Sequence, residues 1–329
     1  MLFRSKVDHA PFVRIPYRQA MQEYGCDKPD LRNPLKMIDV SAHFANTDFK
    51  AFTNVVKQGG VVRAIAVKAI ARESRKFFDD MIEFAQSVGS KGLGYIGWVD
   101  GQPRSPITKF LSAETIAALQ AQAGVGEGDV LFFIADVEKK VQKIGAAVLA
   151  ELAKRLGLLE GNAYRFCWIV DFPMYERNEE TGKIEFSHNP FSMPQGGMEA
   201  LTGKDPLEIL AYQYDLVCNG VELSSGAIRN HRPEVMYKAF ELAGYGQEVV
   251  DARFGGMINA FKLGAPPHGG IAPGVDRIVM LLANVPNIRE VIAFPMNQNA
   301  QDLLMNAPCE VEERQLRELH IRVHLPRKN

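Results

Sequence analysis

The sequence is poor in the features on which secreted and membrane-spanning proteins depend. Its 329 residues include only four cysteines, and these are scattered, without the paired spacing of a metal site or a redox pair. No apolar run approaches the ~20 residues that a bilayer crossing requires, and nothing at the start resembles a signal peptide. The composition therefore predicts a cytoplasmic protein with reduced thiols and no membrane partner.

An excess of charge of either sign is also missing. The formal net charge is -1 and the isoelectric point is near 6.7. Both values argue against a chain that binds polyanions by bulk electrostatics, because phosphate binding usually shows as a basic surface. Any contact with RNA must therefore be local. The length and the 47% hydrophobic content allow a large core and suggest two domains.

Periodicity predicts an α+β chain in which one domain interrupts another. Residues 1–32 and 160–329 would form the interrupted domain, and residues 33–159 an inserted α+β module. In the module we expect strands over 49–56, 60–67, 93–100 and 129–137 and helices over 73–88, 113–122 and 138–156. In the flanking parts we expect a strand over 165–171 and helices over 17–24, 233–243, 251–263 and 312–323.

Near the end of the chain, Gly270 to Arg277 forms a glycine-punctuated strand that leads into the apolar run Ile278 to Leu282. Glycine lets a backbone approach a flat or charged ligand closely. The guanidinium of Arg277 can stack on a base and bind phosphate oxygens. This pattern is typical of an adenylate site. The alternative is an ordinary strand–helix junction in which Asp276 caps free amides.

A second segment supplies two carboxylates. Asn219-Gly220 is a strong hairpin signal, because both central residues of the tight turn need positive φ. The turn predicts three cross-strand pairs: Cys218–Val221, Val217–Glu222 and Leu216–Leu223. Asp215 and Glu222 would then share a sheet face, roughly 7 Å apart, where they repel unless an oxygen-binding divalent cation such as Mg²⁺ lies between them. The alternative is an exposed hairpin whose charges face water.

Arg229 lies an odd number of positions after Glu222, so strict alternation would send its side chain to the opposite face. The small, glycine-containing segment Ser224-Ser225-Gly226 is the kind of place where a strand accommodates an extra residue. We therefore predict a β-bulge there, which returns Arg229 to the side of the two carboxylates.

Together these segments resemble bacterial-type aspartyl-tRNA synthetase, a class II aminoacyl-tRNA synthetase, over nearly the whole chain. The resemblance also includes residues 24–32 (YGCDKPDLR), 168–174 (WIVDFPM), 187–191 (SHNPF) and 291–295 (VIAFP). It implies a partial class II antiparallel sheet flanked by helices. Residues 33–159 would be the insertion domain that this family shares with the amidotransferase B subunit and uses on the tRNA side.

The resemblance implies roles for individual residues. Residues 270–282 match class II motif 3. The implied ATP-binding residues are Glu222, Gly274, Asp276 and Arg277, of which Glu222 and Arg277 would be catalytic. Asp215 and Glu222 would hold the catalytic Mg²⁺. Arg229 would read the side-chain carboxylate of L-aspartate, and His188 would lie in a loop over the amino-acid pocket, where Asn189 replaces a frequent second histidine.

The implied function is aspartate–tRNA ligation, with ATP and Mg²⁺ as cofactors and L-aspartate, ATP and tRNA as partners. Arg229 argues against lysine as the substrate, and the large insertion argues against the lysyl and asparaginyl relatives. Whether only the aspartate tRNA or also the asparagine tRNA is charged stays open.

Several parts of the family are absent from these 329 residues: the N-terminal anticodon-binding barrel, the dimer-forming motif 1, and motif 2, which holds the ATP α-phosphate. We therefore expect a truncated synthetase that is weak or inactive alone, that binds tRNA weakly or not at all, and whose oligomeric state is open. The alternative function is a non-catalytic synthetase-like protein that binds aspartate, nucleotide or tRNA.

Overall fold

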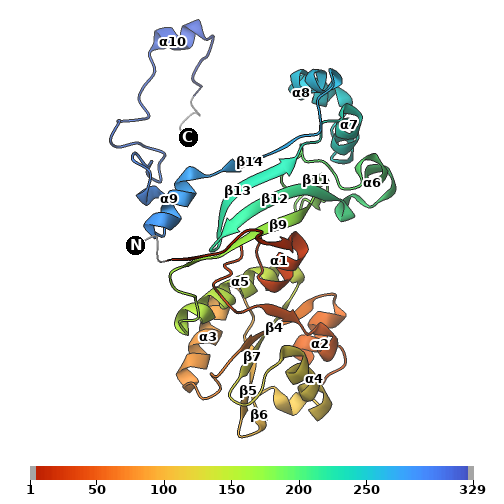
Figure 1. The fold of residues 1–329 in the computed structure, drawn as a ribbon, viewed down its shortest axis with the longest axis vertical. Helices are drawn as coiled ribbons and strands as arrows, with labels where there is room; N and C mark the ends of the chain where they lie inside the picture. Colours follow the sequence, from red (N-terminus) through yellow and green to blue (C-terminus); the bar gives the residue numbers. More distant parts are fainter. Residues whose placement is uncertain (1–4, 325–329) are drawn as a thin grey trace. The chain divides into compact units, whose positions relative to one another are not determined.

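The structure is a computed structural model that describes residues 5–324. Two compact units divide the chain, one up to Pro273 and the other from Gly274 onward, and each is described by itself. The first unit contains two five-stranded sheets, and most of their strands are labelled in Figure 1. The α+β class predicted from periodicity is confirmed.

The first sheet holds the hairpin that was predicted to carry the carboxylates. Its strand order is β14 (Gly269–Pro273), β13 (Val221–Ile228), β12 (Leu210–Cys218), β9 (Phe166–Pro173) and β2 (Val13–Pro16). Four of the strands are antiparallel neighbours, whereas β2 pairs parallel to β9 at the edge. Chain from the first 16 residues and chain from beyond residue 165 thus share one sheet.

The helices of this part are α1 (Tyr17–Glu23), α6 (Gly197–Gly203), α7 (Pro233–Leu242) and α8 (Gln247–Lys262). Pro233 occupies the first turn of α7, where its missing N–H costs no hydrogen bond. Short paired strands complete the unit: β1 (Lys6–Val7) with β8 (Ala163–Tyr164), and β10 (Tyr175–Arg177) with β11 (Ile184–Phe186).

The second sheet is antiparallel throughout and lies within the predicted insertion. Its strand order is β3 (Met37–Asp39), β4 (Val61–Val67), β7 (Val130–Asp136), β5 (Gly94–Val99) and β6 (Gln102–Arg104). Helices α3 (Arg75–Ser87) and α5 (Glu138–Arg155) cover one face, and α2 (Lys50–Lys57) and α4 (Ala113–Ala123) the other (Figure 1). The domain boundaries at 32/33 and 159/160 stay predictions.

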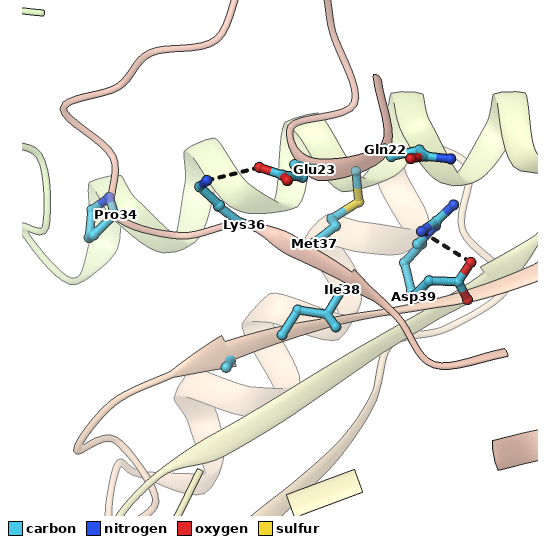
Figure 2. A pocket seen from close by; sticks show the side chains of 9 residues that line it. Gln22, Glu23, Pro34, Lys36, Met37, Ile38 and Asp39 are labelled. Atoms are coloured by element: carbon cyan, nitrogen blue, oxygen red, sulfur yellow. Dashed lines mark hydrogen bonds and ion pairs between the residues drawn. The ribbon is translucent and has the colours of Figure 1, made fainter. Parts of the chain in front are cut away.

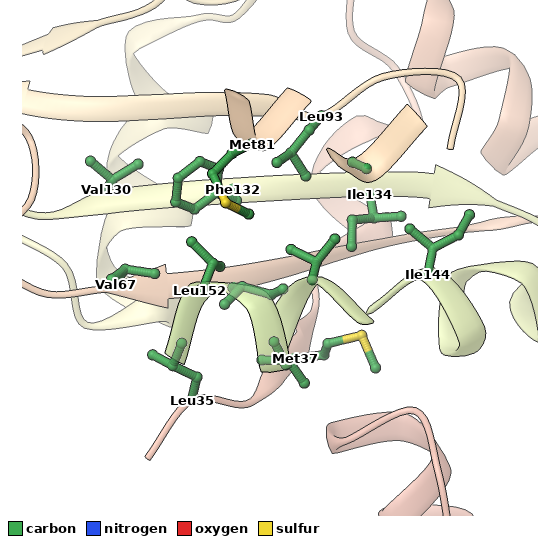
Figure 3. Close-up of a cluster of buried hydrophobic side chains, with 14 of the residues drawn as sticks. Leu35, Met37, Val67, Met81, Leu93, Val130, Phe132, Ile134, Ile144 and Leu152 are labelled. Atoms are coloured by element: carbon green, nitrogen blue, oxygen red, sulfur yellow. The ribbon is translucent and has the colours of Figure 1, made fainter. Parts of the chain in front are cut away.

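A continuous apolar core lies between this sheet and helices α3 and α5. Figure 3 shows Phe132 and Ile134 of β7 among Met81 of α3 and Ile144 and Leu152 of α5, and all five side chains are buried. Burying one such side chain stabilises the fold by about 1.5–3 kcal/mol. The inserted part therefore has a core of its own and does not depend on the first sheet for its apolar packing.

One predicted strand is wrong. Residues 49–56 were expected to be extended, but they form α2, because their apolar side chains recur at helical spacing. Phe49, Phe52 and Val56, at i, i+3 and i+7, face a cluster that contains Phe44 and Phe133. In so short an apolar run, the helical period of 3.6 residues could not be distinguished from the pattern of a buried strand.

The second unit contains α9 (Val275–Ala283), a 3-10 turn over Ile288–Glu290 and α10 (Glu313–Glu318). The last helix is shorter than the predicted range of 312–323. It begins with a capping box in which Glu312 and Gln315 bond each other's backbone N–H groups. Among the residues that the structure describes, no helix has the length and apolar character needed to cross a membrane.

Gly226 controls how closely the edge strand β14 approaches β13. A Cβ at this position would collide with the carbonyl oxygen of Gly270 and lie 2.5 Å from Cε2 of Tyr214. We expect Gly226→Ala to destabilise the edge by about 1–3 kcal/mol and to speed amide exchange of residues 269–272. Gly255→Ala in α8 is the control, because nothing lies within 4 Å of its Cβ; helix propensity should make it stabilising. Equal exchange in both variants would contradict this.

Candidate functional site

The tight turn between β12 and β13 is where the candidate site begins. Asn219 and Gly220 both have positive φ, +52° and +81°. The Asn219 side chain also binds a neighbouring segment, since Oδ1 accepts the N–H of Arg165 at 2.9 Å and Nδ2 donates to the carbonyl of Ala163 at 2.8 Å. The pairs Cys218–Val221 and Val217–Glu222 form as the turn signal predicted.

The third predicted pair is wrong. Leu216 pairs with Ser224, so Leu223 is the extra residue of a bulge. The bulge was expected within Ser224-Ser225-Gly226, but those residues continue the ladder because they also pair with β14 on their other side. Leu223 instead is buried, with 8% of its surface exposed. The sequence could not show this, because it did not reveal that β14 pairs with the small residues.

The bulge has the effect on side-chain direction for which it was predicted. Glu222 stands opposite Val217, two positions after Asp215, so both carboxylates belong to one face. Past the bulge Ser225 stands opposite Asp215, and Arg229 follows four residues later with the same parity. Asp215, Glu222 and Arg229 are thus brought to a common face, and their ligand-binding roles stay predictions.

Asp215 is the most buried of these groups. Only 4% of the residue is exposed, and Oδ1 has no hydrogen-bond partner among the described residues. Burial raises the pKa of this carboxyl above its ordinary value, and the negative charge of Glu222 adds to the rise; a hydrogen bond from Ser225 acts in the opposite direction. An orphaned, desolvated carboxylate oxygen beside a second carboxylate is a place where a cation would be stabilised.

The loop after α1 supplies two charged side chains that the residue-level analysis missed. Lys28 Nζ lies 2.8 Å from Oδ2 of Asp27 and 3.4 Å from Oε2 of Glu222. The loop touches the hairpin turn, because a Cβ on Gly220 would lie 3.8 Å from the Lys28 carbonyl oxygen. No spacing rule links positions that are almost 200 residues apart. Only the resemblance of residues 24–32 to a synthetase segment marked this loop.

The charges around Asp215 fit a divalent cation. Asp27, Asp215 and Glu222 are three carboxylates, and Lys28 is the ammonium among the groups that act on Asp215, so two negative charges are in excess. Within residues 5–324, however, no three His, Cys, Asp or Glu side chains are arranged as a complete metal site. Two carboxylates with further oxygens from phosphate and water is the set that Mg²⁺ commonly takes.

Arg229 is held firmly at the end of β13. Its backbone N–H donates to the carbonyl of His268 at 2.8 Å, and its guanidinium lies 5.5 Å from the ring centre of Phe191, a cation–π distance. Ser192 forms an isolated antiparallel bridge with Arg229. Ser192 and Asn230 are fully buried, with side-chain polar atoms that no described group pairs. Neither residue was predicted from the sequence, since no sequence pattern marks a buried amide or a buried hydroxyl.

His188 is exposed and packs edge-on against two aromatic rings. Its ring centre is 5.1 Å from that of Phe172 and 6.0 Å from that of Tyr17. Asn189 has a structural contact, because its Oδ1 accepts the N–H of Phe191 at 2.9 Å. The loop therefore links His188 to the ring beneath Arg229, and the role of His188 stays a prediction.

Three predicted ATP-binding residues belong to the second unit. Gly274 is the residue before α9, and Asp276 and Arg277 lie in its first turn. The predicted strand and the apolar helix after it are β14 (Gly269–Pro273) and α9 (Val275–Ala283). Their roles stay predictions.

Two basic side chains in the segment before α3 are paired with carboxylates. Lys68 lies 2.9 Å from Asp129, and Arg72 lies 3.0 Å from Asp100. Paired and exposed charges of this kind are typical of a solvated surface. They give no support to an RNA contact here.

A separate cavity of about 460 Å³ lies where α1 meets β3. Figure 2 shows Lys36 reaching toward Glu23, and the two side chains form a 2.8 Å ion pair across the seam. Arg63, which also lines the cavity, is almost fully buried and pairs with Asp39 at 3.2 Å. Each of these charged side chains has an ion-pair partner, so the cavity lies at a packing contact between α1 and β3 and shows no sign of a reactive centre.

Comparison with known proteins gives close relatives. The aspartate–tRNA(Asp/Asn) ligase of Rickettsia bellii is 59% identical over 321 residues, covering 96% of this chain and 53% of that protein. The protein of the same name from Zymomonas mobilis is 59% identical over 317 residues, with the same coverage. This chain thus spans about half the length of the curated relatives that it matches. A solved aspartyl tRNA synthetase from Entamoeba histolytica is 19% identical, covers 74% of this chain and 44% of that chain, and has a TM-score of 0.33.

The family assignment rests on sequence. Residues 4–298 match the family of class II tRNA synthetases (D, K and N), which is far more than half of the chain. The match includes the hairpin, the loop after α1 and the start of α9. The chain therefore belongs to the class II tRNA synthetases of the D, K and N group.

Proposed function

We propose that this chain serves in aspartate–tRNA ligation, in which ATP activates L-aspartate and the amino acid is transferred to tRNA. The observation that carries the proposal is the common sheet face of Asp215, Glu222 and Arg229. Support comes from the 59% identity to proteins named as aspartate–tRNA ligases. The cytoplasmic location that composition predicts is part of the proposal.

Each group on this face has a chemical task in the proposal. Mg²⁺, when bound, would neutralise phosphate charge, and Asp215 and Glu222 are the residues that would hold it. Arg229 would pair with the side-chain carboxylate of aspartate, where a planar guanidinium gives two parallel hydrogen bonds that lysine cannot reproduce. The Phe191 ring would help to position that guanidinium, because the two lie within cation–π distance.

Arg277 would bind ATP from the first turn of α9, with Gly274 and Asp276 before it. Positive charge near the phosphates stabilises the charge that develops as a carboxylate oxygen of aspartate attacks the α-phosphorus. The arginine and acid of motif 2 are missing from these 329 residues. Loss of one such phosphate clamp costs several kcal/mol of transition-state stabilisation.

We therefore expect the purified chain to exchange pyrophosphate into ATP at least 100-fold more slowly than an intact relative. The chain should nonetheless bind ATP–Mg²⁺ or aspartate measurably in calorimetry. Arg277→Ala should weaken nucleotide binding, and Arg229→Ala should weaken aspartate binding. Glu241→Ala on α7 is the control: it removes a surface ion pair with Lys238 and should change neither affinity.

The outcomes separate the proposals. Exchange at the rate of an intact synthetase would refute the expected weakness of the chain. Binding without any exchange would favour the second candidate, a non-catalytic synthetase-like protein that binds aspartate, nucleotide or tRNA. If neither ligand binds, the ligation proposal fails.

A further inference from the structure

Lys28 places a positive charge beside Glu222, one of the two predicted metal ligands. Its ammonium is 3.4 Å from Glu222 Oε2 and 2.8 Å from Asp27 Oδ2, so it bridges the hairpin and the loop after α1. The side chain is partly exposed, at 38%, whereas that of Glu222 is 22% exposed. A flexible four-carbon stem that reaches solvent can change partners without moving the backbone.

The two contacts of Lys28 are not equal. The shorter one joins it to its own neighbour in sequence, and the longer one joins it to the predicted metal ligand. Lys28 can therefore leave Glu222 and keep Asp27. Asp215, in contrast, cannot turn toward solvent, since only 4% of the residue is exposed. Its Oδ1 has no hydrogen-bond partner among the described residues.

We propose that Lys28 is a built-in counter-ion that holds Glu222 in the absence of metal and competes with the divalent cation for it. The inference rests on the proposed function, because it assumes that Asp215 and Glu222 hold the cation. Two consequences follow for the chain. The carboxylates stay in place without metal, because one positive charge offsets part of their repulsion. A divalent ion alone binds weakly, because it must displace the ammonium.

A divalent cation that is already bound to nucleotide phosphates should compete with Lys28 more successfully than the free ion. The phosphate oxygens add negative charge beside Glu222, and the released ammonium then has a new anionic partner close by. Competition by Lys28 therefore acts against the free ion more than against the metal–nucleotide complex. Lys28 is a positioning residue in this scheme and not a catalytic one.

The test measures binding of Mn²⁺ alone, by the loss of its free-ion electron paramagnetic resonance signal, and the melting temperature in EDTA. We expect Lys28→Gln to raise Mn²⁺ affinity about two- to five-fold, the range of one partly exposed ion pair, and to lower the melting temperature in EDTA. Lys36→Gln is the matched control. It removes another partly exposed lysine from a 2.8 Å ion pair, with Glu23, and should leave Mn²⁺ affinity unchanged.

The results are decisive in each case. Lys28→Gln that leaves Mn²⁺ affinity unchanged, or weakens it, overturns the competition. In a Glu222→Gln background, Lys28→Gln should have no further effect on the metal, and a persisting gain would mean that Lys28 acts elsewhere. If the unmodified chain binds no Mn²⁺ at millimolar concentration, the metal site of the proposed function fails, and this outcome is distinct because it is read before any variant is made.

Discussion

Gly25→Ala is expected to destabilise the first unit by about 3–4 kcal/mol. This loss is larger than the one expected for the other glycine-to-alanine substitutions in this chain. Gly25 ends helix α1 with φ +74°, a conformation that costs a residue with a Cβ about 1 kcal/mol. The added carbon would also collide with the backbone carbonyl oxygen of Gln142 and lie 3.0 Å from the Ala146 nitrogen, both in helix α5. A helix backbone cannot rotate aside as a side chain can.

Gly157→Ala separates the two causes. Gly157 follows α5 as Gly25 follows α1, and it has a similar φ of +63°, but nothing lies within 4 Å of its Cβ. We expect that variant to lose only about 1 kcal/mol. Urea denaturation of both variants measures the difference, and equal losses would show that Gly25 is needed for its dihedral alone. Because Gly25 lies two residues before Asp27, its variant should also disturb the contact between Lys28 and Glu222.

Asp215→Asn is expected to abolish divalent-cation binding and at the same time to stabilise the metal-free protein. The carboxyl is buried and its pKa is raised, so its ionised form is disfavoured by the fold. An amide of the same shape removes that charge. A gain of roughly 1 kcal/mol is the scale of one uncompensated buried polar group. Calorimetry with Mn²⁺ and thermal unfolding in EDTA measure the two effects.

The stability gained by Asp215→Asn should depend on pH. A carboxyl whose folded pKa lies above its unfolded pKa contributes most stability below the unfolded value and loses it as pH rises through the folded value. The advantage of Asp215→Asn should therefore be full near pH 8 and shrink as the wild-type group takes up its proton toward about pH 4. Asp79→Asn, an exposed carboxylate of α3, should show a difference below about 0.5 kcal/mol at every pH. A constant difference for Asp215→Asn would argue against a buried charge.

Local signals predicted the secondary structure well where a cap or a turn residue defines the element. Ser112 caps α4 by accepting the N–H of Thr115, and Gly124 ends that helix in the left-handed conformation. The tight turn at Asn219-Gly220 fixed two of the three proposed strand pairs. The failure at residues 49–56 shows the limit, because a short apolar run fits a strand and a buried helix equally well.

The candidate site was predictable only in part, because its members come from distant segments. Asp215, Glu222 and Arg229 lie within 15 residues and could be related by alternation. Lys28 comes from a loop that no periodicity links to the hairpin. The sequence does not mark Ser192 and Asn230, since only the fold shows that these polar side chains are buried. Packing between segments that are distant in sequence determines where these three side chains lie, and local sequence patterns do not reveal such packing.

The extra residue at Leu223 sets the phase of everything that follows it in β13. Loss of Leu223 alone would remove the bulge and keep every other pair of the ladder, so Asp215, Glu222 and Arg229 would stay on one face. Drawing Leu223 into a regular pair opposite Leu216 would instead turn Arg229 to the opposite face, although no charged residue is altered. In this hairpin the common face of the three charged groups therefore depends on the bulge as much as on the identity of the residues.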